Sequence, residues 1–400
     1  MSPRIVAVAG ACLTQFTLIG LLFSFGVLFA ELEAEFGWSR TVVASATSAS
    51  FLVMGLLAST MGRLADRHGP RRVLAGAGTM FALGFAGLSQ ISEPWHLPLI
   101  FALFMGVGLA GHDVVTLSTV ARWFENRRGM MIGIVKTGTA AGQVTLPPLA
   151  ALLIALHGWR DAVALLGAGA LAAVLLAAWA LRAPADPPRA AGAPPVQRAG
   201  VELREARRGR IFWTLCAIQF LFFPTLITVP VHLVVHGRDL GLETTTAAWL
   251  LSVSGGASVA GRLTVGAFVD RIGGRRAYTL CFSALIAALT ALALIRTPEP
   301  LFLAVACYGL AHGGFFTVVA PTVAEHFGLR AHGAIFGAIV FFGTLGAAAG
   351  PIAAGWIFDV TGAYTLAFAV LAGAAVVGLG LSVLLPARPG ATASMAAPAG

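Results

Sequence analysis

The chain has 400 residues, of which 58% are hydrophobic and only 11% charged, and its formal net charge is +9. Soluble domains are about 45–50% apolar and about 25% charged, so too few polar residues remain here to cover a water-facing surface. The composition therefore excludes a soluble enzyme and favours a protein embedded in lipid. The four cysteines stand singly without metal-ligand spacing, so we expect no metal site, and we expect no cofactor.

Apolar runs follow one another along almost the whole chain. A helix needs about 20 such residues to cross a hydrocarbon core about 30 Å thick. Because backbone N–H and C=O groups cannot stay unpaired in lipid, each run predicts a helix rather than a strand. Twelve runs are long enough, at 5–29, 42–61, 73–90, 97–121, 130–155, 162–181, 211–235, 246–269, 277–295, 300–324, 333–355 and 363–385.

The arginines predict how these helices are oriented. With the N-terminus inside, the loops on the inner side carry 20 arginines and the loops on the outer side carry 4. Cytoplasmic loops of membrane proteins collect Lys and Arg, so both termini are expected in the cytoplasm and the protein in the inner (plasma) membrane. These basic loops face anionic lipid headgroups, which explains the net charge without a nucleic acid partner.

The longest loop divides the chain into two parts. Residues 182–210 contain five prolines and seven arginines, which is typical of a flexible cytoplasmic linker. This segment separates a predicted N-terminal six-helix bundle, 1–181, from a C-terminal one, 211–385. The small-residue-rich tail, 386–400, is expected to be disordered.

The two parts are related by an internal repeat at one fixed offset of 204 residues. In the first part the repeat comprises Gly62, Asp66, Arg67, Gly69, Arg71 and Arg72, and in the second Gly266, Asp270, Arg271, Gly273, Arg275 and Arg276. Farther along, Gly133 and Pro147 correspond to Gly337 and Pro351 at the same offset. The expected fold is therefore an all-α membrane protein, with twelve transmembrane helices in two pseudo-symmetric six-helix bundles.

The segment from Gly62 to Arg72 resembles the signature loop between helices 2 and 3 of the major facilitator superfamily. Its counterpart, from Gly266 to Arg276, falls between helices 8 and 9, as that family expects. The resemblance covers essentially the whole chain and implies a substrate path between the two bundles. In these loops glycine permits a tight turn, and an aspartate can pair with arginines to close a cytoplasmic gate. The alternative is a loop that anchors the chain through its positive charge alone.

Three further segments resemble the monocarboxylate-transporter and oxalate/formate-antiporter branch of that superfamily. They are Glu35-Phe-Gly-Trp-Ser-Arg40, Arg122-Trp-Phe with Arg127-Arg128-Gly129, and His232-Leu-Val with Asp239-Leu-Gly. In that branch an arginine on helix 8 binds the substrate carboxylate, and Arg262 fits that place. The chain departs from the animal members in two respects: helix 1 has no lysine, and Ser258 stands where they carry an aspartate.

Ionisable residues inside the predicted spans are the candidates for function, because each charge there costs at least about 2.5–3.5 kcal/mol. They are His112, Asp113, Lys136, Arg262 and His312. Excluding the histidines their charges sum to +1, which would attract an anion. We expect Arg262, Lys136 and His312 to bind substrate, with Arg262 forking onto a carboxylate. Asp113 and His112 are the candidate proton carriers.

Other roles remain open for the same residues. Arg262 could form a fixed salt bridge to Asp113, Lys136 could simply neutralise Asp113, and His312 could be a packing residue. The leading hypothesis is a secondary transporter, functioning as a monomer, of a small organic anion such as a monocarboxylate. It would work by proton symport or anion exchange, since no nucleotide-binding loop is present. The alternatives are an exporter of drug-like or neutral hydrophobic compounds and a non-transporting membrane sensor.

Overall fold

The computed structural model describes residues 2–124, 128–183, 200–328 and 330–387. Most of the predicted linker, at 184–199, and most of the predicted tail, at 388–400, lie outside the described residues, as do the side chains of Asp66 and Asp270. The described secondary structure is helical, apart from an isolated bridge between Gly200 and Gly328.

Long helices account for every predicted span. In the first half they are α1 (Pro3–Phe36), α2 (Arg40–His68), α3 (Pro70–Gly87) with the short η1 (Leu88–Gln90), α4 (His96–Ile100), η2 (Phe101–Gly106), α5 (Val107–Trp123), α6 (Arg128–His157) and α7 (Trp159–Ala180). In the second they are the short α8 (Leu203–Ala206), then α9 (Arg210–Asp239), α10 (Thr244–Ile272), α11 (Gly274–Leu294), α12 (Leu301–Phe327), α13 (His332–Thr361) and α14 (Thr365–Val383). Together α4, η2 and α5 form one continuous span, in which η2 is a π-helical segment.

Eleven of the spans in the described chain are long and apolar enough to cross a membrane. The twelfth, α10, has 29 residues but is richer in Ser, Thr and Gly and carries Arg262. It packs against α12, α6 and α9, and its Ser252, Ser254 and Ser258 side chains are buried. The twelve-helix membrane fold predicted from the sequence is confirmed.

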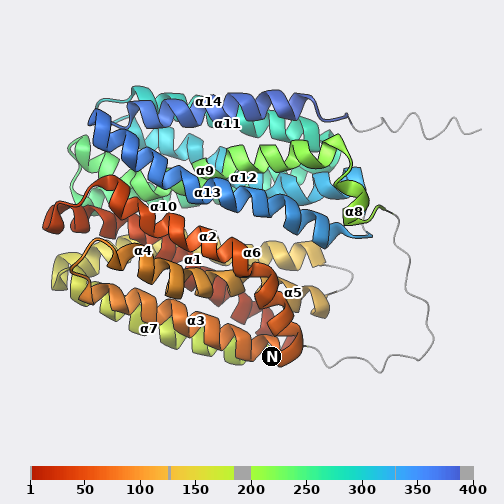
Figure 1. Ribbon diagram of the computed structural model, residues 1–400, viewed down its shortest axis with the longest axis horizontal. Coiled ribbons are helices and arrows are strands. Elements are labelled where there is room, and N and C mark those ends of the chain that lie inside the picture. Colours follow the sequence, from red (N-terminus) through yellow and green to blue (C-terminus); the bar gives the residue numbers. More distant parts are fainter. Residues whose placement is uncertain (1, 125–127, 184–199, 329, 388–400) are drawn as a thin grey trace, which may run out of the picture.

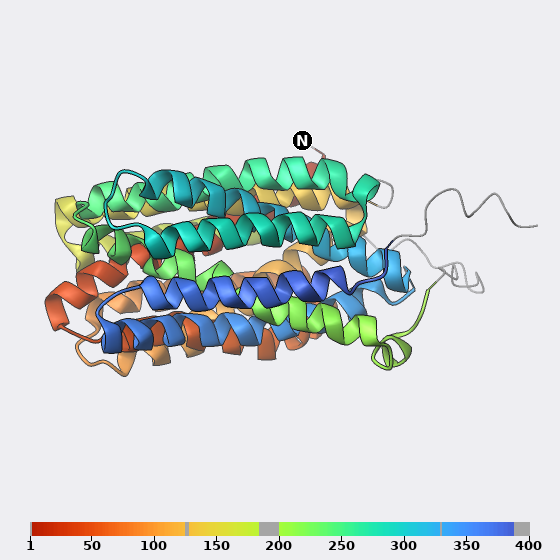
Figure 2. The ribbon, with the colours of Figure 1, turned by 90° about the horizontal axis from the view of Figure 1, so that it is seen from above.

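The helices run along one common axis and form two groups (Figures 1 and 2). Helices α1 to α7 lie on one side and α9 to α14 on the other, and the two groups meet where α2 packs against α13 and α6 against α10. The beginning of α1 and the end of α14 lie at the same end of the molecule. We call this the inner end, following the arginine distribution, and the opposite end, where α1 finishes and α2 begins, the outer end.

The repeat found in the sequence recurs in the backbone. Six glycines with positive φ form three pairs at the 204-residue offset, namely Gly37 with Gly241, Gly69 with Gly273 and Gly158 with Gly362. Each ends a long helix or lies in the turn that follows one, where a left-handed conformation favours glycine. The two halves therefore share their turns as well as their helices.

Close helix approach repeats at the same offset. A Cβ atom on Gly142 of α6 would collide with the carbonyl oxygen of Phe16 in α1. A Cβ atom on Gly346 of α13 would collide with that of Phe220 in α9. Small residues allow such backbone contact between membrane helices, and it brings the polar residues of α1 and α6 together.

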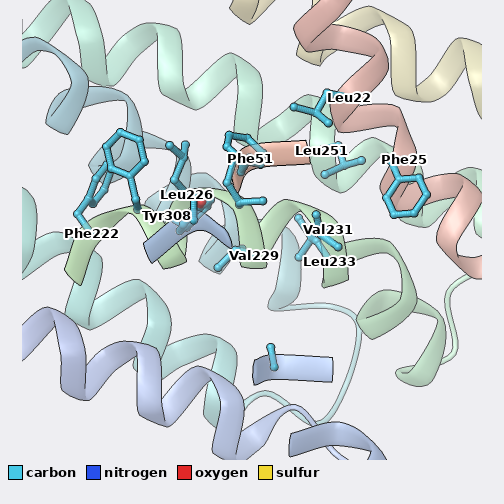
Figure 3. Packing of buried hydrophobic residues seen from close by; sticks show 14 of the residues in the cluster. Leu22, Phe25, Phe51, Phe222, Leu226, Val229, Val231, Leu233, Leu251 and Tyr308 are labelled. Carbon is cyan, nitrogen blue, oxygen red and sulfur yellow. The ribbon is translucent and has the colours of Figure 1, made fainter. Parts of the chain in front are cut away.

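The buried core is continuous between the two halves. Leu22 and Phe25 of α1 belong to the same buried cluster as Leu226 of α9 and Leu251 of α10 (Figure 3). Phe51 of α2 joins them from the first half. Apolar packing thus runs across the boundary between the two halves.

Candidate substrate and coupling site

Asp113 is the centre of a polar cluster inside the first half. Its Oδ1 atom accepts hydrogen bonds from Lys136 Nζ at 2.6 Å and from Gln15 Nε2 at 2.7 Å. These three residues come from α5, α6 and α1. The Asp113 and Lys136 side chains remain 40% and 31% exposed, so the protein does not fully enclose the pair. The interpretation in which Lys136 neutralises Asp113 therefore agrees with the observed contact.

Gln15 is a member of this cluster that sequence reasoning missed. It is fully buried, its Nε2 also lies 3.4 Å from Thr116 Oγ1, and its Oε1 accepts from Thr139 Oγ1 at 3.0 Å. The close approach of α1 and α6 at Gly138 and Gly142 places it there. Its sequence signal is an uncharged polar residue within an apolar run. A search restricted to ionisable residues does not detect such a residue.

His112 sits beside Asp113, with a hydrogen bond at one ring nitrogen and a carboxylate near the other. Its Nδ1 is hydrogen-bonded to the carbonyl oxygen of Leu109, and its Nε2 lies 3.4 Å from Asp113 Oδ1. The Nε2 contact is an ion-pair distance, and the hydrogen bond that the structure gives this ring is the one to Leu109. The two groups are therefore close enough for the charge of one to influence the protonation of the other. The π-helical segment η2 ends six residues before His112, and such segments are frequent near functional sites.

Arg262 reaches from α10 to the first half. Its Nη1 donates to the carbonyl oxygen of Lys136 at 3.2 Å, and its Cζ lies 5.1 Å from the centre of the Phe316 ring. Its Nε is buried without a hydrogen-bond partner in the described structure. Across the described residues we find no ion pair to Arg262, so the fixed salt bridge to Asp113 is not formed in this conformation.

His312 lies apart from the Asp113 cluster. It is buried on α12 among aromatic rings, with centroids 5.4 Å from Tyr308 and 5.2 Å from Phe316. Neither ring nitrogen has a hydrogen-bond partner among the described atoms. Phe316 is therefore the ring that contacts both His312 and Arg262.

The two gate motifs lie at the inner end, in the turns between α2 and α3 and between α10 and α11. Arg67, Arg71, Arg72, Arg271 and Arg276 are exposed there. Across the second turn, the backbone N–H of Gly274 donates to Glu325 Oε2 on α12 at 3.0 Å. Because the Asp66 and Asp270 side chains are not described, pairing between aspartate and arginine stays a prediction.

Comparison with known proteins identifies the family to which this chain belongs. The family model described as Major Facilitator Superfamily matches residues 11–298 and 233–398. The chain belongs to the major facilitator superfamily. Its relatives are transporters rather than enzymes, and the chain is a multi-pass membrane protein of that kind.

Among its relatives in the superfamily are two named monocarboxylate transporters. Monocarboxylate transporter 13 of Bos taurus is 29% identical over 92% of this chain and 86% of the relative. Monocarboxylate transporter 11 of Homo sapiens is 30% identical over 87% of this chain and 76% of the relative. This superfamily member is therefore of the monocarboxylate-transporter type.

Solved structures agree on the fold. A mutant form of the nucleoside transporter NupG matches with a TM-score of 0.76 at 15% identity, covering 94% of this chain and 98% of that one. A bacterial homologue of the human lysosomal transporter Spinster matches with a TM-score of 0.72 at 17% identity, covering 96% and 94%. At these identities the likeness supports the twelve-helix architecture alone.

Proposed function

We propose that this chain is a secondary active transporter of a small organic anion, and specifically of a monocarboxylate. One observation carries the proposal. Lys136 is matched by Asp113, whereas Arg262, on the opposing half, has no ion-pair partner among the described residues. A single carboxylate would supply the missing negative charge, and the guanidinium can bind it through two hydrogen bonds. The related monocarboxylate transporters 13 and 11 are named for the same class of substrate.

The proposed cycle is alternating access between the two halves, taken as 1–181 and 211–385 and joined by 182–210. Arg262 and Lys136 belong to opposite halves and already contact each other through the Lys136 carbonyl. An anion bound between them would favour the state in which they are close, because a ligand shifts an equilibrium toward the state that it binds better. In this scheme the two gate motifs close the inner end, and both termini and the tail, 386–400, lie in the cytoplasm.

Asp113 and His112 are the proposed proton carriers. His112 Nδ1 is hydrogen-bonded to the Leu109 carbonyl, and its Nε2 lies 3.4 Å from Asp113 Oδ1, so the neighbouring carboxylate would stabilise a protonated ring. Proton uptake at this pair would weaken the hold of Asp113 on Lys136 and free a second cation for the anion. Without a proton gradient, the transporter would exchange one anion for another, and Asp113 and His112 would keep their protonation states. His312 is proposed to contact the substrate on the Phe316 side of Arg262.

The test is uptake by purified protein in liposomes, with lactate, pyruvate, formate, oxalate and aromatic acids, each with and without a pH gradient. Arg262→Ala should abolish uptake of the carboxylate that is carried, because the anion loses the guanidinium that would bind it through two hydrogen bonds. Arg330→Ala is the matched control, since Arg330 is an exposed arginine paired with Glu202 at the surface. Normal uptake by Arg262→Ala would remove the proposed anion site. Uptake of neutral compounds and of none of the acids would favour the exporter instead.

A further inference from the structure

At the outer end, one arginine of the first half is inserted into the second. Arg40 is the first residue of α2, and its side chain is only 6% exposed. Its Nη1 and Nη2 atoms donate to both carboxylate oxygens of Asp239, the last residue of α9, at 2.5 and 2.7 Å. Arg40 and Asp239 each lie in a segment that resembles the monocarboxylate-transporter branch. The structure brings these two segments into contact, and neither residue belongs to the proposed anion site.

The guanidinium of Arg40 occupies a socket built by the second half. Its Cζ lies 3.6 Å from the centre of the Phe358 ring and 5.1 Å from that of Tyr364. Its Nε donates to Glu33 Oε1 of its own half at 2.8 Å. A planar guanidinium stacks on aromatic rings and pairs with carboxylates at the same time, which a lysine cannot do as well.

A buried histidine fixes the wall of this socket. His232 Nε2 donates to the carbonyl oxygen of Pro351 at 3.0 Å, and its Nδ1 therefore accepts from the Tyr364 hydroxyl at 2.7 Å. His232 is fully buried on α9, Pro351 lies on α13 and Tyr364 precedes α14. Three elements of the second half thus hold the ring against which Arg40 rests.

A second contact joins the halves at the start of α2. The carboxylate of Asp359, on α13, accepts from the backbone N–H of Arg40 at 2.8 Å, from the N–H of Thr41 at 2.9 Å and from the Thr41 hydroxyl at 2.5 Å. These N–H groups have no partner within α2, because they lie in its first turn. A carboxylate at a helix N-terminus is also favoured by the helix dipole.

We propose that the Arg40–Asp239 ion pair, seated in the Phe358–Tyr364 socket, is the latch that holds the outer end closed during the transport cycle. Opening toward that side withdraws Arg40 from the socket and separates it from Asp239. The proposal rests on alternating access and not on which solute is carried. Beneath the latch, Thr47 of α2 and Val231 of α9 are buried and line a small void between the halves, which opening would expose.

The test is labelling of Thr47→Cys from outside intact cells with a membrane-impermeant maleimide. The background replaces the native thiols Cys12, Cys216, Cys281 and Cys307. Arg40→Ala should raise the labelling rate at least about tenfold, because loss of the latch shifts the equilibrium toward the state that is open to the outside. A tenfold change corresponds to a shift of about 1.4 kcal/mol in that equilibrium. Asp239→Asn, which keeps the side-chain volume, should raise it in the same direction.

The matched control is Arg160→Ala. Arg160 pairs with Glu35 at the same end of the molecule at 2.5 Å, but both belong to the first half, so its loss should leave labelling unchanged. A parallel variant retains only Cys281, which is buried in the second half and must stay unlabelled while the protein is folded. If Cys281 labels in Arg40→Ala, that variant has unfolded and Asp239→Asn decides the test.

Three results would overturn the latch. One is an unchanged rate at Thr47→Cys in folded Arg40→Ala and Asp239→Asn. Another is an equal rise in Arg160→Ala. The last is labelling that increases only when the reagent is supplied from the cytoplasmic side.

Discussion

Removing the charge of Asp113 isolates the contribution of the central ion pair. Two unit charges 2.6 Å apart attract by about 6 kcal/mol at an effective dielectric constant of about 20. The two side chains are 40% and 31% exposed, so solvent screening and the cost of desolvation reduce the net interaction to about 1–2 kcal/mol. Asp113→Asn leaves Lys136 and Arg262 as two unmatched cations, and Lys136→Met leaves the carboxylate with Gln15 and His112 beside it.

A double-mutant cycle measures this interaction. Each single substitution should lower the apparent melting temperature in detergent by about 1–3 °C. The combined variant, Asp113→Asn with Lys136→Met, should lose less than the sum of the two, with a coupling of about 1–2 kcal/mol. In liposomes, Asp113→Asn should also lose the stimulation of uptake by a proton gradient while retaining anion exchange.

The reasoning is refuted if the two substitutions are additive within about 0.5 kcal/mol, since residues in direct contact should couple. Unchanged gradient stimulation in Asp113→Asn would separately remove the carboxylate from the proposed proton path. The same cycle with Arg262→Ala in place of Lys136→Met serves as the control. We expect its coupling in stability to be smaller, because no ion pair joins Asp113 and Arg262 among the described contacts.

Two further predictions concern packing. Gly142→Ala and Gly346→Ala should each destabilise the protein by about 1–3 kcal/mol, because the new Cβ meets a carbonyl oxygen of the neighbouring helix. Gly76→Ala, where a Cβ would have nothing within 4 Å, should be neutral or stabilising when thermal unfolding is measured. Equal effects at all three sites would refute the packing argument. His312→Phe should raise the melting temperature, because it removes two buried nitrogens without partners, and should lower the affinity in uptake assays; unchanged affinity would make His312 a packing residue only.

The sequence alone was sufficient for the architecture. Lipid requires every spanning backbone to be helical, so the length and apolarity of each run predicted the helices, and α10 was found although it is the least apolar. The offset of 204 residues, found in two loops, also describes the turn glycines and the close contacts of Gly142 and Gly346. Because these features are local or periodic in the sequence, they can be predicted from it.

The same reasoning placed charges within the membrane but left their partners open. Asp113 could have paired with Arg262 or with Lys136, and the fold brings it to Lys136 while Arg262 meets only the Lys136 carbonyl in the described structure. Gln15 entered the site because α1 and α6 approach closely enough to bury it against Asp113.

The contact between Arg40 and Asp239 joins residues 199 positions apart, in helices of different halves. Nothing in the spacing of either segment specifies it. The rotation of a helix about its axis and its distance from each neighbour decide which side chains touch. Both are set by packing over the whole helix bundle, so the sequence determined the helices and the charges, and only the tertiary structure determined the pairs.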